Sequence, residues 1–169
     1  MDGVMPPDGA ALQRRGRTIA KALRAVWLRT GRPMSMSDRP GRFLIQKTVY
    51  LLKSQGYPPA TRYEYNVYLN GPYSPDLAAE YYAVGDDGLR SAPAATDIPP
   101  STLNLVAEAL SRSPDFLEGL TTVIDGVVTQ GSPQAALSWA KSIKPQLSES
   151  TWREVRTFLS GHQELIAHR

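Results

Sequence analysis

The chain has 169 residues, no cysteine and a formal net charge of +3, and this length fits one domain that buries a core of its own. The absence of cysteine excludes disulfides, thiolate metal sites, iron–sulfur clusters held by cysteine, and cysteine nucleophiles. Because no apolar run approaches the ~20 residues of a membrane span and no signal-peptide pattern is present, we expect a cytoplasmic protein without a membrane partner.

The positive charge is concentrated in the N-terminal part of the chain. Residues 1–62 hold 12 of the 19 basic residues and three of the 16 acidic ones, a balance of 12 − 3 = +9, and the remainder carries 7 − 13 = −6. Fourteen of the 19 basic residues are Arg, whose planar guanidinium suits bidentate contacts with carboxylates and phosphates. Three kinds of partner remain open: nucleic acid, an acidic protein surface, or the acidic half of a second copy.

The first structured element is predicted to be an amphipathic helix. Residues 1–9 are rich in glycine and proline and are expected to form a disordered leader. From Ala10 to about Thr30, apolar residues recur at spacings of three, four and seven, which is typical of a helix with one buried face. A second stripe on this helix is cationic and provides four candidate partner-binding residues: Arg14, Arg17, Lys21 and Arg24.

A second helix is predicted from Ser37 or Asp38, either of which can act as its N-cap, to about Gln55. Residues 43–52 are apolar over most of the circumference of this helix, so we expect them at the centre of the domain. A helix this apolar is unsuited to reading base edges in a DNA groove.

A tyrosine-rich strand and turn follow. Residues 61–69 alternate with a period of two and predict a β-strand, which Asn70, Gly71 and Pro72 break. Gly71 and Pro72 are explained by the turn itself, whereas a turn does not require the tyrosines around it. Exposed aromatic residues are common anchors of protein interfaces. The segment therefore provides four further candidate partner-binding residues: Tyr68, Asn70, Tyr73 and Tyr81.

The turn leads into another helix. Ser74 is expected to be its N-cap and Pro75 its first residue, with an end at Gly85. Residues 88–91 predict a short second strand that would complete a hairpin-like wing. We therefore expect residues 10–91 to form a winged-helix-like portion.

The rest of the chain is predicted to be helical. Residues 92–100 contain three prolines and predict a linker. Four serines mark the starts of helices in a C-terminal helical portion, residues 101–169: Ser101, Ser113, Ser132 and Ser148. The expected fold class is mainly α with a small β hairpin, in one compact domain over residues 10–169.

The sequence offers few residues for catalysis. Its two histidines, His162 and His168, are six residues apart and fall on different faces of a helix. Asp86 and Asp87 are expected in a turn, and no phosphate-binding glycine loop, nucleophile elbow or zinc-protease motif is present. We therefore expect no catalytic residue, no metal site and no cofactor, and we predict that the protein is not an enzyme.

Several motifs resemble those of known bacterial proteins. They are Gln46-Lys47-x-x-Tyr50, Tyr68-x-x-Gly71-Pro72-Tyr73-Ser74-Pro75 and, more weakly, Leu117-Glu118 and Lys141-x-x-Lys144-Pro145. In these motifs the chain is similar to YwgA-type bacterial proteins and, more distantly, to the Panacea domain of SocA-type antitoxins, over roughly residues 17–160. The resemblance implies a compact helical fold with a winged-helix-like portion. Its more distant part, to the Panacea domain, implies a module that neutralises toxins directly or acts as a protease adaptor, whereas YwgA-type proteins have no settled activity. Neither group implies a catalytic residue.

Two functional hypotheses follow. The leading one is a protein-binding module of the antitoxin or adaptor kind, whose partner is a toxin or another effector and whose docking surface combines the cationic helix with the tyrosine-rich turn. The alternative is a DNA-binding winged-helix regulator, which the +9 charge of residues 1–62 allows. An enzyme would need a nucleotide or a metal from outside, because no residue set here suggests either.

Overall fold

The computed structural model describes residues 9–68 and 71–166, with Tyr68 described only in its backbone. This part of the chain is mainly helical and contains a small two-stranded antiparallel sheet, as predicted. Gly9 already belongs to the first helix, and the rest of the predicted leader, residues 1–8, lies outside the described residues. Within the described part, no helix is both long enough and apolar enough to cross a bilayer.

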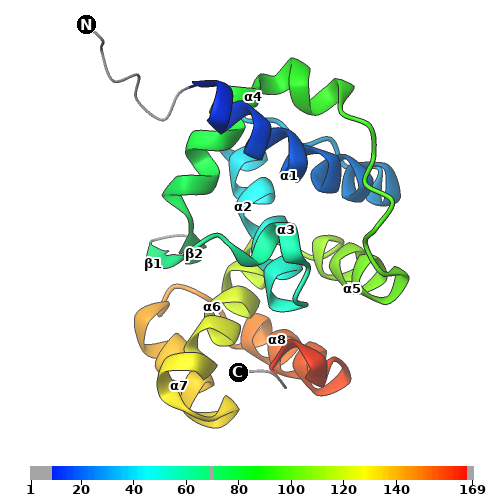
Figure 1. Cartoon of the computed structure of the whole chain (residues 1–169). Helices are drawn as coiled ribbons and strands as arrows, with labels where there is room; N and C mark the ends of the chain where they lie inside the picture. The colour runs from blue at the N-terminus through cyan, green and yellow to red at the C-terminus, as the bar shows by residue number, and fades with distance from the viewer. Residues whose placement is uncertain (1–8, 69–70, 167–169) are drawn as a thin grey trace, which may run out of the picture.

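Eight α-helices, two strands and one 3-10 turn make up the described part of the chain. The helices are α1 (Gly9–Thr30), α2 (Arg39–Ser54), α3 (Pro58–Thr61), α4 (Pro75–Ser91), α5 (Pro100–Leu110), α6 (Pro114–Gln130), α7 (Pro133–Ile143) and α8 (Glu149–Gly161). The strands are β1 (Asn66–Tyr68) and β2 (Gly71–Tyr73), and the 3-10 turn is η1 (Gln163–Leu165). Figure 1 shows α1 and α4 together at one end of the molecule, α6, α7 and α8 at the other, and α2 between them.

Most helix starts follow from local capping chemistry. Asp38, a predicted N-cap of α2, accepts a hydrogen bond from the backbone N–H of Gly41 (2.7 Å). Such a cap satisfies a backbone donor that the helix itself leaves unpaired. Four serines cap the helices that follow them in the same way: Ser74 for α4, Ser113 for α6, Ser132 for α7 and Ser148 for α8. Ser101 does not cap its helix, since α5 begins at Pro100 with Pro99 in the cap position.

α2 is the central helix of the fold, as its apolar sequence predicts. Eleven of its 16 residues are buried, and it packs against α1, α3, α5, α6 and β2. The buried residues include three polar ones in succession: Gln46, Lys47 and Thr48. Burying polar groups is costly unless they are hydrogen-bonded, so this segment has to find partners inside the fold.

α1 and α4 pack closely against each other at Gly16. A Cβ atom at this position would lie 2.5 Å from Val84 Cγ2 and 2.8 Å from the carbonyl oxygen of Glu80. We therefore expect Gly16→Ala to push the two helices apart and to lower the free energy of unfolding by about 1–3 kcal/mol. Chemical denaturation checks this, with Gly9→Ala as the control because a Cβ there meets nothing within 4 Å. An unchanged midpoint for Gly16→Ala would contradict the close packing.

The β-hairpin is smaller than predicted. β1 covers only part of the strand predicted over residues 61–69, because α3 ends at the start of that segment and residues 62–65 adopt no regular strand structure. β2 forms where Gly71 and Pro72 were expected only to break the strand, and Val67 pairs with Pro72 across the hairpin. Pro72 is tolerated because both strands of a two-stranded sheet are edge strands.

The strand predicted over residues 88–91 is wrong, because this segment is the second half of α4. Gly85 interrupts the helix with a φ of 76°, a conformation that glycine adopts at little cost. The helix then resumes at Asp86, whose carboxylate accepts hydrogen bonds from the backbone N–H of Met36 (2.7 Å) and the hydroxyl of Ser35 (2.9 Å). The turn expected at this aspartate is therefore a helix kink that is tied to the loop before α2.

The proline-rich segment between α4 and α5, predicted as a linker, packs against the rest of the fold. The backbone N–H of Ala95 donates to the carbonyl of Lys21 (2.9 Å), and the Tyr57 hydroxyl donates to Asp97 (2.7 Å). Ile98 is buried. The segment therefore holds α5 in place beside α1 and α2.

Candidate functional site

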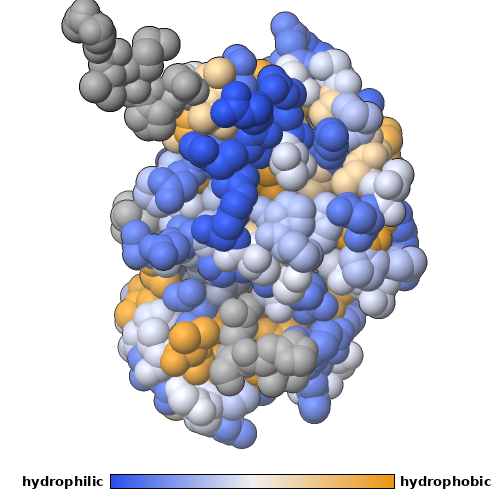
Figure 2. Space-filling view, viewed as in Figure 1, coloured by the Kyte–Doolittle hydropathy of each residue, from blue (hydrophilic) through white to orange (hydrophobic). Residues whose placement is uncertain are grey.

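The exposed side of α1 carries cations without an acidic partner in the described part of the chain. Arg14, Arg17 and Lys21 are exposed, and no carboxylate among residues 9–68 and 71–166 forms an ion pair with them. We call these three residues the cationic face. Figure 2 shows strongly hydrophilic surface over the end of the molecule where α1 lies. Like charges three and four residues apart on a helix repel each other, so an anionic partner would lower the energy of this face.

Arg24, the fourth cation predicted for this surface, is less available to a partner. It is half-buried, and its guanidinium lies 4.5 Å from the ring centroid of Trp27. Such a cation–π contact already stabilises the charge within the protein. We therefore leave Arg24 out of the cationic face.

A small pocket opens beside the cationic face, between α1 and the second half of α4. Its volume is about 260 Å³, with Arg17 and Lys21 on one side and Val84, Gly88 and Ser91 on the other. Small-molecule sites usually have volumes of about 300–1,000 Å³. This pocket is therefore better suited to one anionic side chain of a partner than to a larger ligand.

The structure places the predicted tyrosine anchors in different environments. Tyr81 is only 1% exposed, so its ring belongs to the core and cannot be the surface anchor that was predicted. Tyr73 is half-buried and packs against the core. The side chain of Tyr68 and all of Asn70 lie outside the described residues. On α4 it is Tyr82, 50% exposed, that faces outward. Neighbouring helix residues point about 100° apart, and Tyr81 shares its face with the buried Leu77, four residues earlier.

Several residues of the family-like motifs form a buried polar network beneath the hairpin. The Gln46 side chain accepts a hydrogen bond from the backbone N–H of Ser74 (2.9 Å) and donates one to its carbonyl (3.0 Å). Lys47 Nζ donates to the carbonyl of Pro72 (2.8 Å). Gly71 has a φ of 92°, and a Cβ there would lie 3.0 Å from Lys47 Nζ. These residues therefore attach β2 and the start of α4 to α2.

The same network extends to the C-terminal helices. Lys144, which follows α7, lies 3.2 Å from the carboxylate of Glu118 on α6, and Gln146 donates to the same carboxylate (3.3 Å). Lys47, Glu118 and Lys144 are all buried. Burial lowers the pKa of Lys47 to about 7, against a raising influence of Glu118 and with a further lowering by Lys144. One signal for this network is visible in the sequence, namely polar residues within apolar helical stretches.

A second buried cluster joins α1, α4 and the segment after α3. The Glu80 carboxylate accepts hydrogen bonds from Arg62 through both oxygens (2.8 Å each) and from the Tyr63 hydroxyl (2.6 Å). Arg15 Nε lies 3.4 Å from the same carboxylate. Burial alone would raise the pKa of Glu80, but the hydrogen bonds from Arg62 and Tyr63 and the charges of both arginines lower it below its usual range. Arg15 is therefore paired with Glu80 although it is partly open to solvent, whereas its neighbour Arg14 has no carboxylate partner among the described residues.

The described residues contain no group of three or more His, Cys, Asp or Glu side chains that could hold a metal ion. His162 stacks on Phe158 with ring centroids 4.2 Å apart, and its Nε2 lies 3.2 Å from the carboxylate of Glu108. The His162 side chain is thus packed against the end of α8 and is mostly shielded from solvent. His168 lies outside the described residues.

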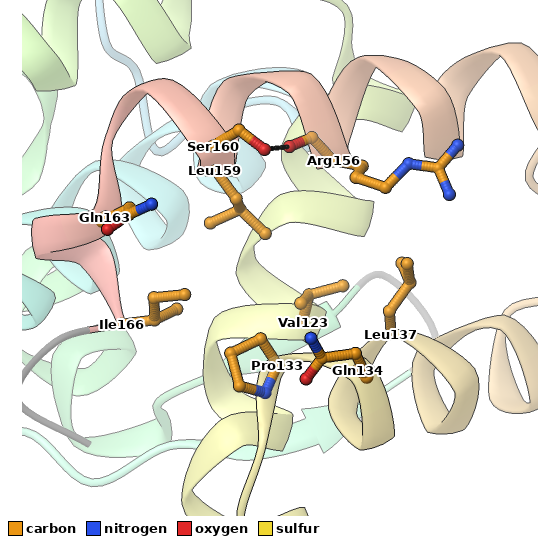
Figure 3. Close-up of a pocket in the computed structure, with 9 residues that line it drawn as sticks. All are labelled: Val123, Pro133, Gln134, Leu137, Arg156, Leu159, Ser160, Gln163 and Ile166. Atoms are coloured by element: carbon orange, nitrogen blue, oxygen red, sulfur yellow. Dashed lines mark hydrogen bonds between the residues drawn. The ribbon is translucent and has the colours of Figure 1, made fainter.

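A larger pocket, with a volume of about 600 Å³, lies among α6, α7, α8 and η1. Figure 3 shows Leu159 pointing from α8 toward Val123 and Pro133, with Arg156 at one end of the pocket and Gln163 at the other. We call it the C-terminal pocket. The sequence did not reveal it, because its walls come from separate elements that each show only an ordinary amphipathic pattern.

Comparison of the chain with protein-family models, with curated protein sequences and with solved structures gives no significant match. Membership of the YwgA-type or Panacea group therefore stays a prediction from the sequence motifs. The fold by itself defines a mainly helical protein with a small hairpin, and the function has to be inferred from the geometry of its surfaces.

Proposed function

We propose that the chain is a non-catalytic protein-binding module of the antitoxin or adaptor kind, which docks an acidic protein on the cationic face of α1. The observation that carries this proposal is the exposed set of Arg14, Arg17 and Lys21, which no carboxylate of the described residues neutralises. Buried arginines at interfaces are frequent binding hot spots, each contributing about 2 kcal/mol or more. The resemblance to toxin-neutralising modules supports the same function.

The geometry of the cationic face limits the shape of the partner. Lys21 follows Arg14 by seven positions, which corresponds to about 10 Å along the helix axis at a rise of 1.5 Å per residue. Arg17 and Lys21 also line the α1–α4 pocket. The partner surface that fits best is therefore a short acidic segment, with one carboxylate inserted into the pocket and a second one near Arg14.

DNA binding is the rival proposal. The hairpin and the long helix before it support this proposal less well than the cationic face supports protein docking. The strands of the hairpin are three residues long, and α2, the long helix that precedes the hairpin, is mostly buried. A winged helix needs an exposed helix that can enter the major groove. The cationic face alone could still bind phosphates without sequence preference, with a steep dependence on salt.

Charge reversal tests the docking proposal. We expect Arg17→Glu/Lys21→Glu to weaken partner binding at least 100-fold, because each substitution replaces attraction by repulsion at an anchor worth about 2 kcal/mol. Arg39→Glu/Arg153→Glu is the matched control, with the same change in net charge at two other exposed arginines. Wild type, the double variant and the control are each immobilised and exposed to an extract of the native host. Proteins that wild type and the control retain are identified. The affinity of each retained protein for all three immobilised proteins is then measured.

The outcome separates the two proposals. An acidic protein that binds wild type and the control but not Arg17→Glu/Lys21→Glu supports the docking function. Equal retention by all three proteins contradicts the assignment of the cationic face. A mobility shift with duplex DNA that weakens steeply between about 50 and 200 mM salt, in wild type and not in the double variant, would favour phosphate binding instead.

A further inference from the structure

The C-terminal pocket has the size and lining of a site for a small apolar molecule. Its volume of about 600 Å³ lies within the usual range of about 300–1,000 Å³ for such sites, which often occur between the helices of a bundle. Its apolar lining residues include Pro133 and Leu137 from α7, Leu159 from α8 and Ile166 after η1. These side chains surround the space from both sides in Figure 3.

The charge that lines the pocket is positive and lies at one end. Arg156 is the one ionisable side chain among the described residues that line it, and within residues 9–68 and 71–166 no carboxylate forms an ion pair with Arg156. The other polar groups of the lining are neutral, and Gln163 lies at the end opposite to Arg156 (Figure 3). An anionic end group would therefore be attracted to one end of the pocket, whereas a cationic one would be repelled.

We propose that the C-terminal pocket binds an elongated apolar molecule that ends in a carboxylate, of the class of medium-chain fatty acids. Its carboxylate pairs with Arg156, which presents a planar fork of N–H donors suited to a carboxylate. Its chain lies along the end of α8 and past it toward Gln163 in η1. Leu137 and Leu159 cover the chain and remove it from water, which provides most of the binding free energy.

This site is separate from the proposed docking surface. The cationic face lies on α1, whereas the walls of the pocket belong to α6, α7, α8 and the segment around η1, at opposite ends of the molecule in Figure 1. The pocket proposal can therefore succeed or fail independently of the function proposed for the cationic face.

Calorimetric titration of the full chain tests the proposal with decanoate below its micelle concentration. Decanol and decylamine serve as probes with the same chain but a neutral or a cationic end group. We expect one decanoate per chain, weaker binding of decanol and the weakest binding of decylamine. Arg156→Gln should weaken decanoate binding about tenfold, because a charge-assisted pair is lost, and should leave decanol binding unchanged. Leu137→Trp should abolish the binding of decanoate and of decanol, because the larger side chain fills the pocket.

The matched control is Arg153→Gln, which removes an exposed arginine of the same helix that lines a different hollow. It should bind decanoate like wild type. Circular dichroism confirms that each variant is folded before titration. Absence of decanoate binding to the wild type would overturn the proposal, as would equal binding of all three probes or equal loss in Arg153→Gln and Arg156→Gln. Concentration-dependent dimerisation without decanoate binding would show instead that the pocket is covered by a second copy.

Discussion

Glu80→Gln is expected to lower the free energy of unfolding by about 3 kcal/mol, near the lower end of the cost of breaking a buried ion pair. The Glu80 side chain is 3% exposed and receives three short hydrogen bonds, two from Arg62 and one from Tyr63. Glutamine keeps one acceptor oxygen but turns an amide donor toward the guanidinium, which has only donors. Arg62 is 35% exposed, so it can recover part of its hydration, which is why we expect the lower end of the range.

Urea denaturation of wild type and Glu80→Gln measures this effect. Glu64→Gln is the control, because Glu64 is exposed and its substitution should change stability by less than about 0.5 kcal/mol.

The pH dependence of stability provides a second readout. The folded-state pKa of Glu80 is lowered, so its stabilisation is present above the usual glutamate pKa and is lost as the pH falls through the folded-state value. Wild type should therefore lose stability on acidification that Glu80→Gln does not lose. A loss below about 1 kcal/mol at neutral pH would contradict this role of Glu80.

The buried amine of Lys47 predicts that the protein becomes more stable as the pH rises above neutrality. Burial lowers its pKa from 10.5 to about 7, so between these values the unfolded chain binds a proton that the folded chain does not. Stability rises with pH wherever the unfolded state binds more protons, by up to about 1.4 kcal/mol per pH unit for one group. We therefore expect a gain of about 2–3 kcal/mol between about pH 7 and pH 9.

Comparison with Lys47→Met isolates this contribution. Methionine has a similar length and no charge, so the gain between the two pH values should disappear while other titrating groups remain. Lys141→Met is the matched control, since Lys141 is partly exposed and its amine lies 3.7 Å from the carboxylate of Glu149. It should keep the pH dependence of wild type. If Lys47→Met and wild type gained equally with pH, the amine of Lys47 would be charged in the folded state throughout.

The two buried clusters also show why motif residues need not be contact residues. Gln46, Lys47 and Ser74 are joined by hydrogen bonds inside the protein, and Lys47 is 2% exposed. These residues belong to the motifs that resemble toxin-binding modules. Their role in this fold is to attach the hairpin to α2. The docking surface that we propose, the cationic face of α1, lies outside the strongest motifs.

The helical elements were predictable where a short stretch of chain decides them. Ser74, Ser113 and Ser148 cap their helices through hydrogen bonds to a backbone N–H three residues ahead, so all the necessary information is local. The apolar circumference of α2 likewise predicted its central position, because such a surface is stable only when it is covered from several sides. The strand predicted over residues 88–91 failed, since four residues of mixed polarity do not distinguish a strand from a helix end.

The sequence by itself determined most helix starts, the buried centre and the concentration of positive charge in the N-terminal part, because capping, periodicity and charge act through neighbours in the chain. Only the tertiary structure decided which of two adjacent residues is engaged inside the protein. Arg15 pairs with Glu80 while Arg14, likewise exposed, forms no ion pair with a carboxylate of the described residues, and Tyr81 is buried while Tyr82 is 50% exposed. The orientation of α1 against α4 makes that difference, and it depends on contacts between residues about 65 positions apart.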